Sequence, residues 1–77
     1  MKRGINSKIT PDMIDSVFSD PKLLKKFTHP RKDKHICEMR LAGEYYSDIA
    51  KRCRMSEYYC RQTIQRVVRL YQVFLSP

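Results

Sequence analysis

In the first part of the chain, three prolines each directly follow a polar residue: Pro11, Pro21 and Pro30. Proline is favoured at the first position of a helix because the N–H group that it lacks would have no partner there. Thr and Asp are favoured at the preceding position, where their side chains cap the first turn. Thr10 and Asp20 occupy that position. The prolines therefore predict helices that begin near residues 11, 21 and 30.

Apolar residues follow each of these starts at helical spacing, and no stretch shows the alternation that is typical of a strand. The third helix is expected to run from Pro30 to Ala42, because Gly43 is the kind of residue that stands just past a helix end. The apolar residues expected inside are Ile14, Val17 and Phe18 in the first helix, Leu23, Leu24 and Phe27 in the second, and Ile36, Cys37, Met39 and Leu41 in the third.

A fourth, short helix is expected to begin at Ser47 or just before it. Ile49, Ala50 and Cys53 then fall on its inner face. A small side chain at Ala50 lets the next helix cross closely, whereas a larger one would hold the two helices apart. A short helix followed by a tight turn and a longer helix predicts a helix-turn-helix.

The last helix is expected to be the longest, starting behind Ser56 with Glu57 at the positive end of the helix dipole. Its apolar stripe continues to Leu75, beyond what a three-helix core requires. The N-terminal helices can cover this extension, or a second copy of the chain can pair with it in a homodimer. We favour cover within the monomer because so small a chain needs the buried area. The inner face carries Cys60, Ile64, Val67, Val68, Tyr71, Phe74 and Leu75, and the outer face carries Arg61, Gln62, Gln65, Arg66, Arg69 and Gln72.

These elements predict an all-α fold of four to five helices in one compact domain, residues 1–77, with a C-terminal helix-turn-helix and a long last helix. Residues 1–8 are expected to be a flexible basic arm, residues 10–29 the short N-terminal helices and residues 30–75 the helix-turn-helix core. Among the five tyrosines, we expect Tyr46 and Tyr71 to be largely packed, and Tyr58 or Tyr59 to face outward.

The charge of the chain indicates a polyanionic partner. Sixteen Lys and Arg residues against eight Asp and Glu give a formal net charge of +8 on 77 residues. A field of this density favours nucleic acid first and an anionic membrane surface second. No apolar run approaches the roughly 20 residues that cross a bilayer, and the N-terminus lacks the apolar stretch of a secretory signal. We therefore expect a cytoplasmic protein with no membrane partner.

The cysteines agree with an intracellular compartment. Cys37, Cys53 and Cys60 are odd in number and lack the close pairing of a disulfide framework or a zinc site, so no metal is expected, although His29 or His35 would complete a three-Cys, one-His set on paper. No carboxylate pair, Gly-rich phosphate loop or nucleophile–base arrangement is present. We expect no cofactor and no enzyme activity.

The segment RLAGEYYSDIAKRCRMSEYYCRQTIQRVVRLYQ, preceded by KHICEM, resembles the helix-turn-helix of sigma factor region four and of LuxR-type response regulators. The resemblance covers residues 31–72. Arg54 stands at the turn position that is usually Gly in that group, so the turn is expected to be strained or to differ in geometry. The matching positions are Leu41 and Ala42 leading into Gly43, the seven-residue step from Gly43 to Ala50, Asp48-Ile49-Ala50, Met55-Ser56, and the inward pair Cys60 and Ile64.

The resemblance implies a transcriptional regulator that inserts the helix starting near Ser56 into the major groove of duplex DNA. Its size and resemblance suggest a small free-standing regulator from a phage or mobile element. Arg side chains pair with guanine edges, Gln with adenine and Glu with cytosine, whereas cations beside the groove bind phosphates. The expected base contacts are Glu57, Tyr58, Tyr59, Arg61, Gln62 and Gln65, and the expected backbone contacts are Lys51, Arg52, Arg54, Arg66 and Arg69.

A second function is left open by the same pattern. A sigma-like fold can dock on RNA polymerase or on another regulatory protein through these faces, with Glu57, Tyr58 and Tyr59 meeting a protein surface. The basic arm is a further open point, because Lys2 and Arg3 would suit a minor groove.

Overall fold

The first two helices begin where the prolines predict. In the computed structural model, which describes residues 9–75, α1 spans Pro11–Ser19 and α2 spans Pro21–Leu24. Thr10 Oγ1 accepts a hydrogen bond from the N–H of Met13 at 3.2 Å, and Asp20 Oδ1 accepts one from the N–H of Lys22 at 2.9 Å. Both predicted caps are confirmed. The basic arm, with Lys2 and Arg3, lies outside the described residues.

The third helix, α3 (Pro30–Leu41), ends in the turn predicted from Gly43. Gly43 has a φ of +93°, in the region that favours glycine. Its N–H donates to the carbonyl of Arg40 at 3.0 Å, and the N–H of Glu44 donates to the carbonyl of Met39 at 3.2 Å. This pair of bonds is a Schellman motif, which satisfies carbonyls that the helix itself leaves free.

Two helices joined by three residues follow, as predicted. The first, α4 (Tyr46–Cys53), begins just before Ser47, and Tyr45 precedes it without a capping side-chain bond. Ser56 caps α5 (Glu57–Leu70), because its Oγ accepts the N–H of Tyr59 at 3.0 Å. The predicted single helix to Leu75 is corrected in one respect: the α-helix stops at Leu70, and the turn η2 (Tyr71–Leu75) is π-helical.

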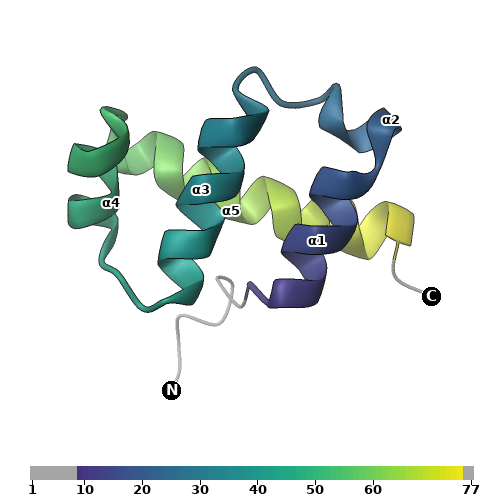
Figure 1. The fold of residues 1–77 in the computed structure, drawn as a ribbon, viewed down its shortest axis with the longest axis horizontal. Helices are drawn as coiled ribbons and strands as arrows, with labels where there is room; N and C mark the ends of the chain where they lie inside the picture. The colour runs from purple at the N-terminus through teal and green to yellow at the C-terminus, as the bar shows by residue number, and fades with distance from the viewer. Residues whose placement is uncertain (1–8, 76–77) are drawn as a thin grey trace.

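The helices α1, α3 and α4 pack on α5, and α2 packs on α1. In Figure 1, α5 runs behind α3 and α1, with α4 at one end and the C-terminus at the other. Both α1 and α3 contact α5, and α1 also contacts η2, where the Tyr71 hydroxyl donates to Asp12 Oδ2 at 2.9 Å. Thus α1 covers one side of the extension of the last helix, whereas Val73 and Phe74 stay exposed. Residues 9–75 contain no strand, so the described fold is all-α. Among the described helices, none combines the length and apolar character needed to span a bilayer.

The core contains most of the predicted inward residues. Three expected members lie outside it. Leu24 is only partly buried, and Leu41 is 41% exposed. Phe74 is 57% exposed because the widened π-helical turn shifts the residues after Leu70 out of the α-helical stripe. Tyr46 and Tyr71 are half-buried against the core. The fully buried side chains are Val17, Asp33, Ile36, Cys37, Ile49, Cys60, Ile64 and Val67.

The turn between α4 and α5 is built on Arg54, which has a φ of +56° and a ψ of +41°. Its N–H and that of Met55 both donate to the carbonyl of Ala50. Arg54 therefore does at the end of α4 what Gly43 does at the end of α3. A side chain in this left-handed region costs on the order of 1 kcal/mol, so the strain expected from the sequence is confirmed.

Replacing Arg54 with glycine is expected to stabilise the protein by about 0.5–1 kcal/mol and to raise Tm by a few degrees. Glycine removes the strain, and its greater freedom in the unfolded chain offsets part of the gain. Lys51→Gly is the matched control: it removes the same charge from inside α4 and should cost about 1 kcal/mol. Thermal unfolding followed by circular dichroism measures both. Equal destabilisation by the two variants would contradict strain at Arg54.

Candidate nucleic-acid interface

One face of α5 is polar, cationic and open to solvent. Tyr58, Arg61, Gln62, Gln65 and Arg69 are all exposed and recur at steps of three and four, so they lie on one side of the helix. Tyr58 has 71% of its surface exposed. The structure therefore places five of the predicted contacts in one row that runs along nearly the whole helix.

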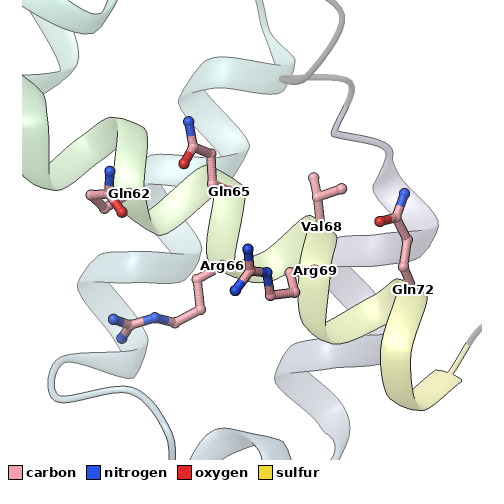
Figure 2. A pocket seen from close by; sticks show the side chains of 6 residues that line it. All are labelled: Gln62, Gln65, Arg66, Val68, Arg69 and Gln72. Carbon is pink, nitrogen blue, oxygen red and sulfur yellow. The ribbon is translucent and has the colours of Figure 1, made fainter.

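The second half of this face is hollowed. Figure 2 shows the side chains that line the hollow, five of which come from α5 and one, Gln72, from η2. Five of the six are polar and end in amide or guanidinium groups, which are the groups that donate to base edges and phosphate oxygens. The lining residues are Gln62, Gln65, Arg66, Val68, Arg69 and Gln72.

Arg61 is positioned by two neighbours. Its Nη2 lies 3.7 Å from Glu57 Oε1, one helical turn earlier. Its guanidinium carbon lies 5.1 Å from the ring centroid of Tyr46, which also has the guanidinium of Arg40 at 4.5 Å. Because the Glu57 pair is exposed, it is worth little in stability. The two contacts restrict where the Arg61 guanidinium lies on the N-terminal half of α5.

Tyr59 does not belong to the outward face, which corrects the expectation that it is a base contact. Its hydroxyl donates to Asp33 Oδ1 at 2.7 Å, and Asp33 is only 1% exposed, in α3. Burial, followed by this hydrogen bond, raises the pKa of Tyr59 to about 12. The side chain therefore ties the N-terminal end of α5 to α3, and Tyr58 is the member of the pair that faces solvent.

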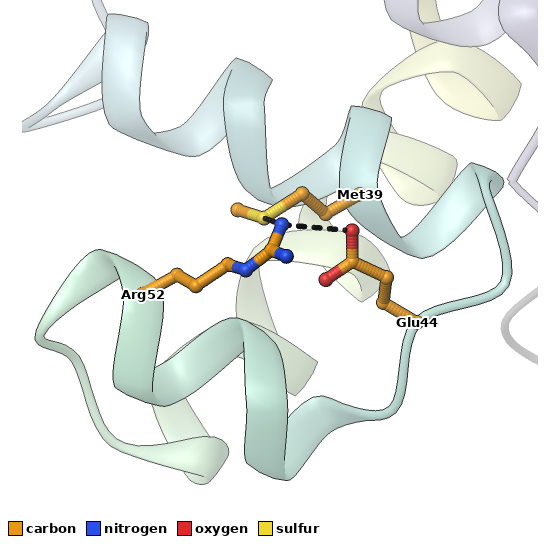
Figure 3. A network of polar contacts seen from close by, with 3 residues as sticks. All are labelled: Met39, Glu44 and Arg52. Atoms are coloured by element: carbon orange, nitrogen blue, oxygen red, sulfur yellow. Dashed lines mark hydrogen bonds and ion pairs between the residues drawn. The ribbon is translucent and has the colours of Figure 1, made fainter.

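The cations at the turn differ in how they are held. Arg52 Nη1 lies 3.1 Å from Glu44 Oε2 and 3.9 Å from the sulfur of Met39, so Arg52 ties α4 back to the preceding turn (Figure 3). Lys51 and Arg54 are exposed. To contact a phosphate, Arg52 would have to share the Glu44 carboxylate or break this ion pair. Within residues 9–75, Lys51 and Arg54 have no such partner to give up, and they face solvent near the start of α5.

The cysteines are packing residues. Cys37, Cys53 and Cys60 are free thiols, one in each of α3, α4 and α5, and all are buried. Burial raises the pKa of each of them, to about 12 for Cys37. For Cys53, the desolvation outweighs the lowering effect of the cations Lys32 and Arg52. In residues 9–75, no three His, Cys, Asp or Glu side chains gather in a way that would hold a metal ion.

Two features of this region were not predicted. Asp33 stands in the charged run PRKDKH, which reads as a solvated helix start, and nothing in the sequence marks it as buried. The second feature is the segment after α2. In this segment, the carbonyl of Lys26 accepts a hydrogen bond from Arg66 Nη1 at 3.4 Å, although the two residues are 40 positions apart. The sequence shows the lysine at position 26, but its place beside α5 depends on the tertiary fold.

Comparisons with protein families, with characterised proteins and with solved structures found no match to this chain. What this surface does is therefore inferred from its own geometry and charge.

Proposed function

We propose that the protein is a sequence-specific regulator of transcription that binds duplex DNA by inserting the exposed face of α5 into the major groove. The observation that carries this proposal is the row formed by Arg61, Gln62 and Gln65 on a helix that follows a three-residue turn. Guanidinium and amide groups are the side-chain groups that read guanine and adenine edges. A helix with these groups on its outer face and apolar groups on its inner face fits a groove wide enough to admit one helix.

The surrounding charge supports the same function. Lys51 and Arg54 lie at the turn before α5, and Arg66 and Arg69 lie in its second half. Cations at both ends of the reading face suit the phosphates that border a groove. The formal net charge of +8 supplies the long-range attraction that brings such a protein to DNA. The resemblance of residues 31–72 to sigma factor region four is consistent with this arrangement.

The salt dependence of binding tests the proposal most directly. Each phosphate contact contributes about 0.9 to the slope of log K against log salt, so contacts from Lys51, Arg52, Arg54, Arg66 and Arg69 predict a slope of about −4 to −5. Fluorescence anisotropy with a labelled random duplex of about 20 base pairs, at several salt concentrations, gives the slope. Absence of binding at low salt would sink the proposal.

Substituting Arg61 with alanine is expected to cost about 1–3 kcal/mol of binding free energy on the preferred sequence and to relax the preference at one base position. The measurement is selection of bound sequences from a random duplex pool, repeated with the variant. Arg69→Ala is the matched control on the same face, because a phosphate contact should weaken binding to all sequences about equally. Circular dichroism checks that loss of the Tyr46 contact leaves the fold intact. Identical effects of the two variants would contradict base reading by Arg61.

A second candidate is a protein-binding module that docks on RNA polymerase or another regulator. The observation in its favour is a pair of exposed aromatic side chains near the helix starts: Tyr45, which precedes α4, is 73% exposed, and Tyr58 in α5 is 71% exposed. Aromatic side chains are enriched where proteins meet each other. The anisotropy titration separates the two candidates, since a protein-binding module has no reason to show a steep salt slope with DNA.

A further inference from the structure

The segment after α2 lies against the second half of α5. The Arg66 guanidinium reaches the carbonyl of Lys26, as described above, and the Nζ of Lys26 lies 5.7 Å from the ring centroid of Phe74. Arg66 belongs to α5 and Phe74 to η2, so Lys26 contacts both parts of the last helix. Lys26 therefore lies beside Arg66, which also lines the hollow in Figure 2.

Four cations of this region are here called the far patch: Lys26, whose carbonyl bonds Arg66; Arg66 and Arg69, which both line the hollow; and Lys25, which precedes Lys26 in the chain. All four are exposed. The two ion pairs of the described residues join Arg52 to Glu44 and Arg61 to Glu57, so neither includes a member of the far patch. Cations that lie close together repel one another when no carboxylate pairs with them. An anion with several closely spaced negative charges relieves that repulsion when it binds.

The far patch stands at a definite distance from the start of the reading face. Along an α-helix each residue rises 1.5 Å, so Arg66 lies about 12 Å beyond Tyr58. With the exposed face of α5 in the groove, Lys51 and Arg54 lie beside the start of the helix, and the far patch lies beside its second half.

We propose that the far patch binds the phosphate backbone beside the second half of α5, so that Lys25 and Lys26 add phosphate contacts from outside the helix-turn-helix. This inference rests on the proposed function and deepens it. The protein would then contact phosphates beside the start of α5 and beside its second half, with the base-reading residues of α5 between the two sets of phosphate contacts. Lys25 and Lys26 would raise affinity for all sequences alike and would carry no base preference.

The test is the salt slope of a variant that removes the two lysine charges, Lys25→Gln/Lys26→Gln. With Lys25 and Lys26 added to the five contacts counted above, the slope of the unaltered protein becomes about −6. Loss of these two contacts should return the slope to about −4 to −5 and weaken binding by on the order of tenfold at moderate salt. The selected base sequence should stay unchanged. Anisotropy titrations with the labelled random duplex at four or more salt concentrations give both quantities, and a circular dichroism melt checks the fold. Lys25→Gln alone, which leaves the contacts of Lys26 in place, should show about half of the slope change.

A variant of equal charge separates direct contact from the general field of the protein. Arg31→Gln/Lys34→Gln removes two exposed cations from α3 and also lowers the formal net charge from +8 to +6, because each substitution removes one positive charge. Its salt slope should stay close to that of the unaltered protein. If both double variants change the slope equally, or if neither does while the unaltered protein still binds, the inference about the far patch is wrong and the proposed function stands. If the unaltered protein does not bind DNA at low salt, the proposed function fails and the far patch fails with it.

Discussion

Replacing Tyr59 with phenylalanine is expected to lower the free energy of unfolding by about 2–3 kcal/mol and Tm by about 10–20 °C. The substitution keeps the ring but removes the hydroxyl that donates to Asp33 Oδ1 at 2.7 Å. Asp33 is almost fully buried, so its carboxyl oxygen loses a partner that water does not readily replace. Urea denaturation followed by circular dichroism measures the change.

Tyr58→Phe is the matched control for this experiment. It removes the same hydroxyl one residue earlier, from a side chain that is 71% exposed, and should change stability by less than about 0.5 kcal/mol. A cost at Tyr59 that is no larger than the cost at Tyr58 would show that the bond to Asp33 contributes little.

The pH dependence of the Tyr59 effect gives a second readout. The folded-state pKa is raised to about 12, above the ordinary value of 10. A raised pKa means that the neutral hydroxyl is favoured by folding, so its contribution is complete below pH 10 and is lost as the pH rises to about 12. The difference in stability between the unaltered protein and Tyr59→Phe should therefore shrink over this window. The comparison cancels the titration of the cysteines, which both proteins share.

Enlarging Ala50 to leucine is expected to destabilise the protein by about 1–3 kcal/mol. Ala50 is 8% exposed in α4, which packs on α5, and its carbonyl accepts the N–H groups that close the turn at Arg54. Because Ala50 is buried at this crossing, added methylene groups must displace neighbouring side chains or move the two helices apart. The measured quantity is the free energy of unfolding in urea.

Ala42→Leu is the control, because Ala42 caps the end of α3 and is exposed. It should change stability by less than about 0.5 kcal/mol. The Ala50 variant should also bind DNA more weakly under conditions where it is folded, since α5 would no longer be held at the same angle to the turn. Equal stability of the Ala42 and Ala50 variants would contradict a tight crossing.

The parts of the fold that the sequence predicts are those that local chemistry determines. Thr10, Asp20 and Ser56 each cap a helix by a bond to a nearby N–H group, and Gly43 ends α3 for a reason that lies within a few residues. The inner and outer faces of α5 follow from helical spacing alone. These signals are short-range, so a single sequence contains them in full.

The missed features depend on contacts between distant segments. Tyr58 and Tyr59 are adjacent and chemically identical, and the choice between them is made by Asp33, 26 residues earlier. The place of Lys26 beside Arg66 likewise requires the packing of α2 against the body of the fold. Phe74 was misjudged because the sequence gives no sign that the last turn widens from α to π geometry.

The three thiols have a consequence for how the motions of this protein are measured. Each of α3, α4 and α5 carries one buried cysteine, so each helix contains a native chemical reporter of its own opening. A disulfide reagent reacts only with a thiol that has become exposed, and the rate of reaction therefore reports the free energy of the opening that exposes it. Variants that retain one cysteine at a time would show whether α4 opens separately from α5 or only when the whole domain unfolds.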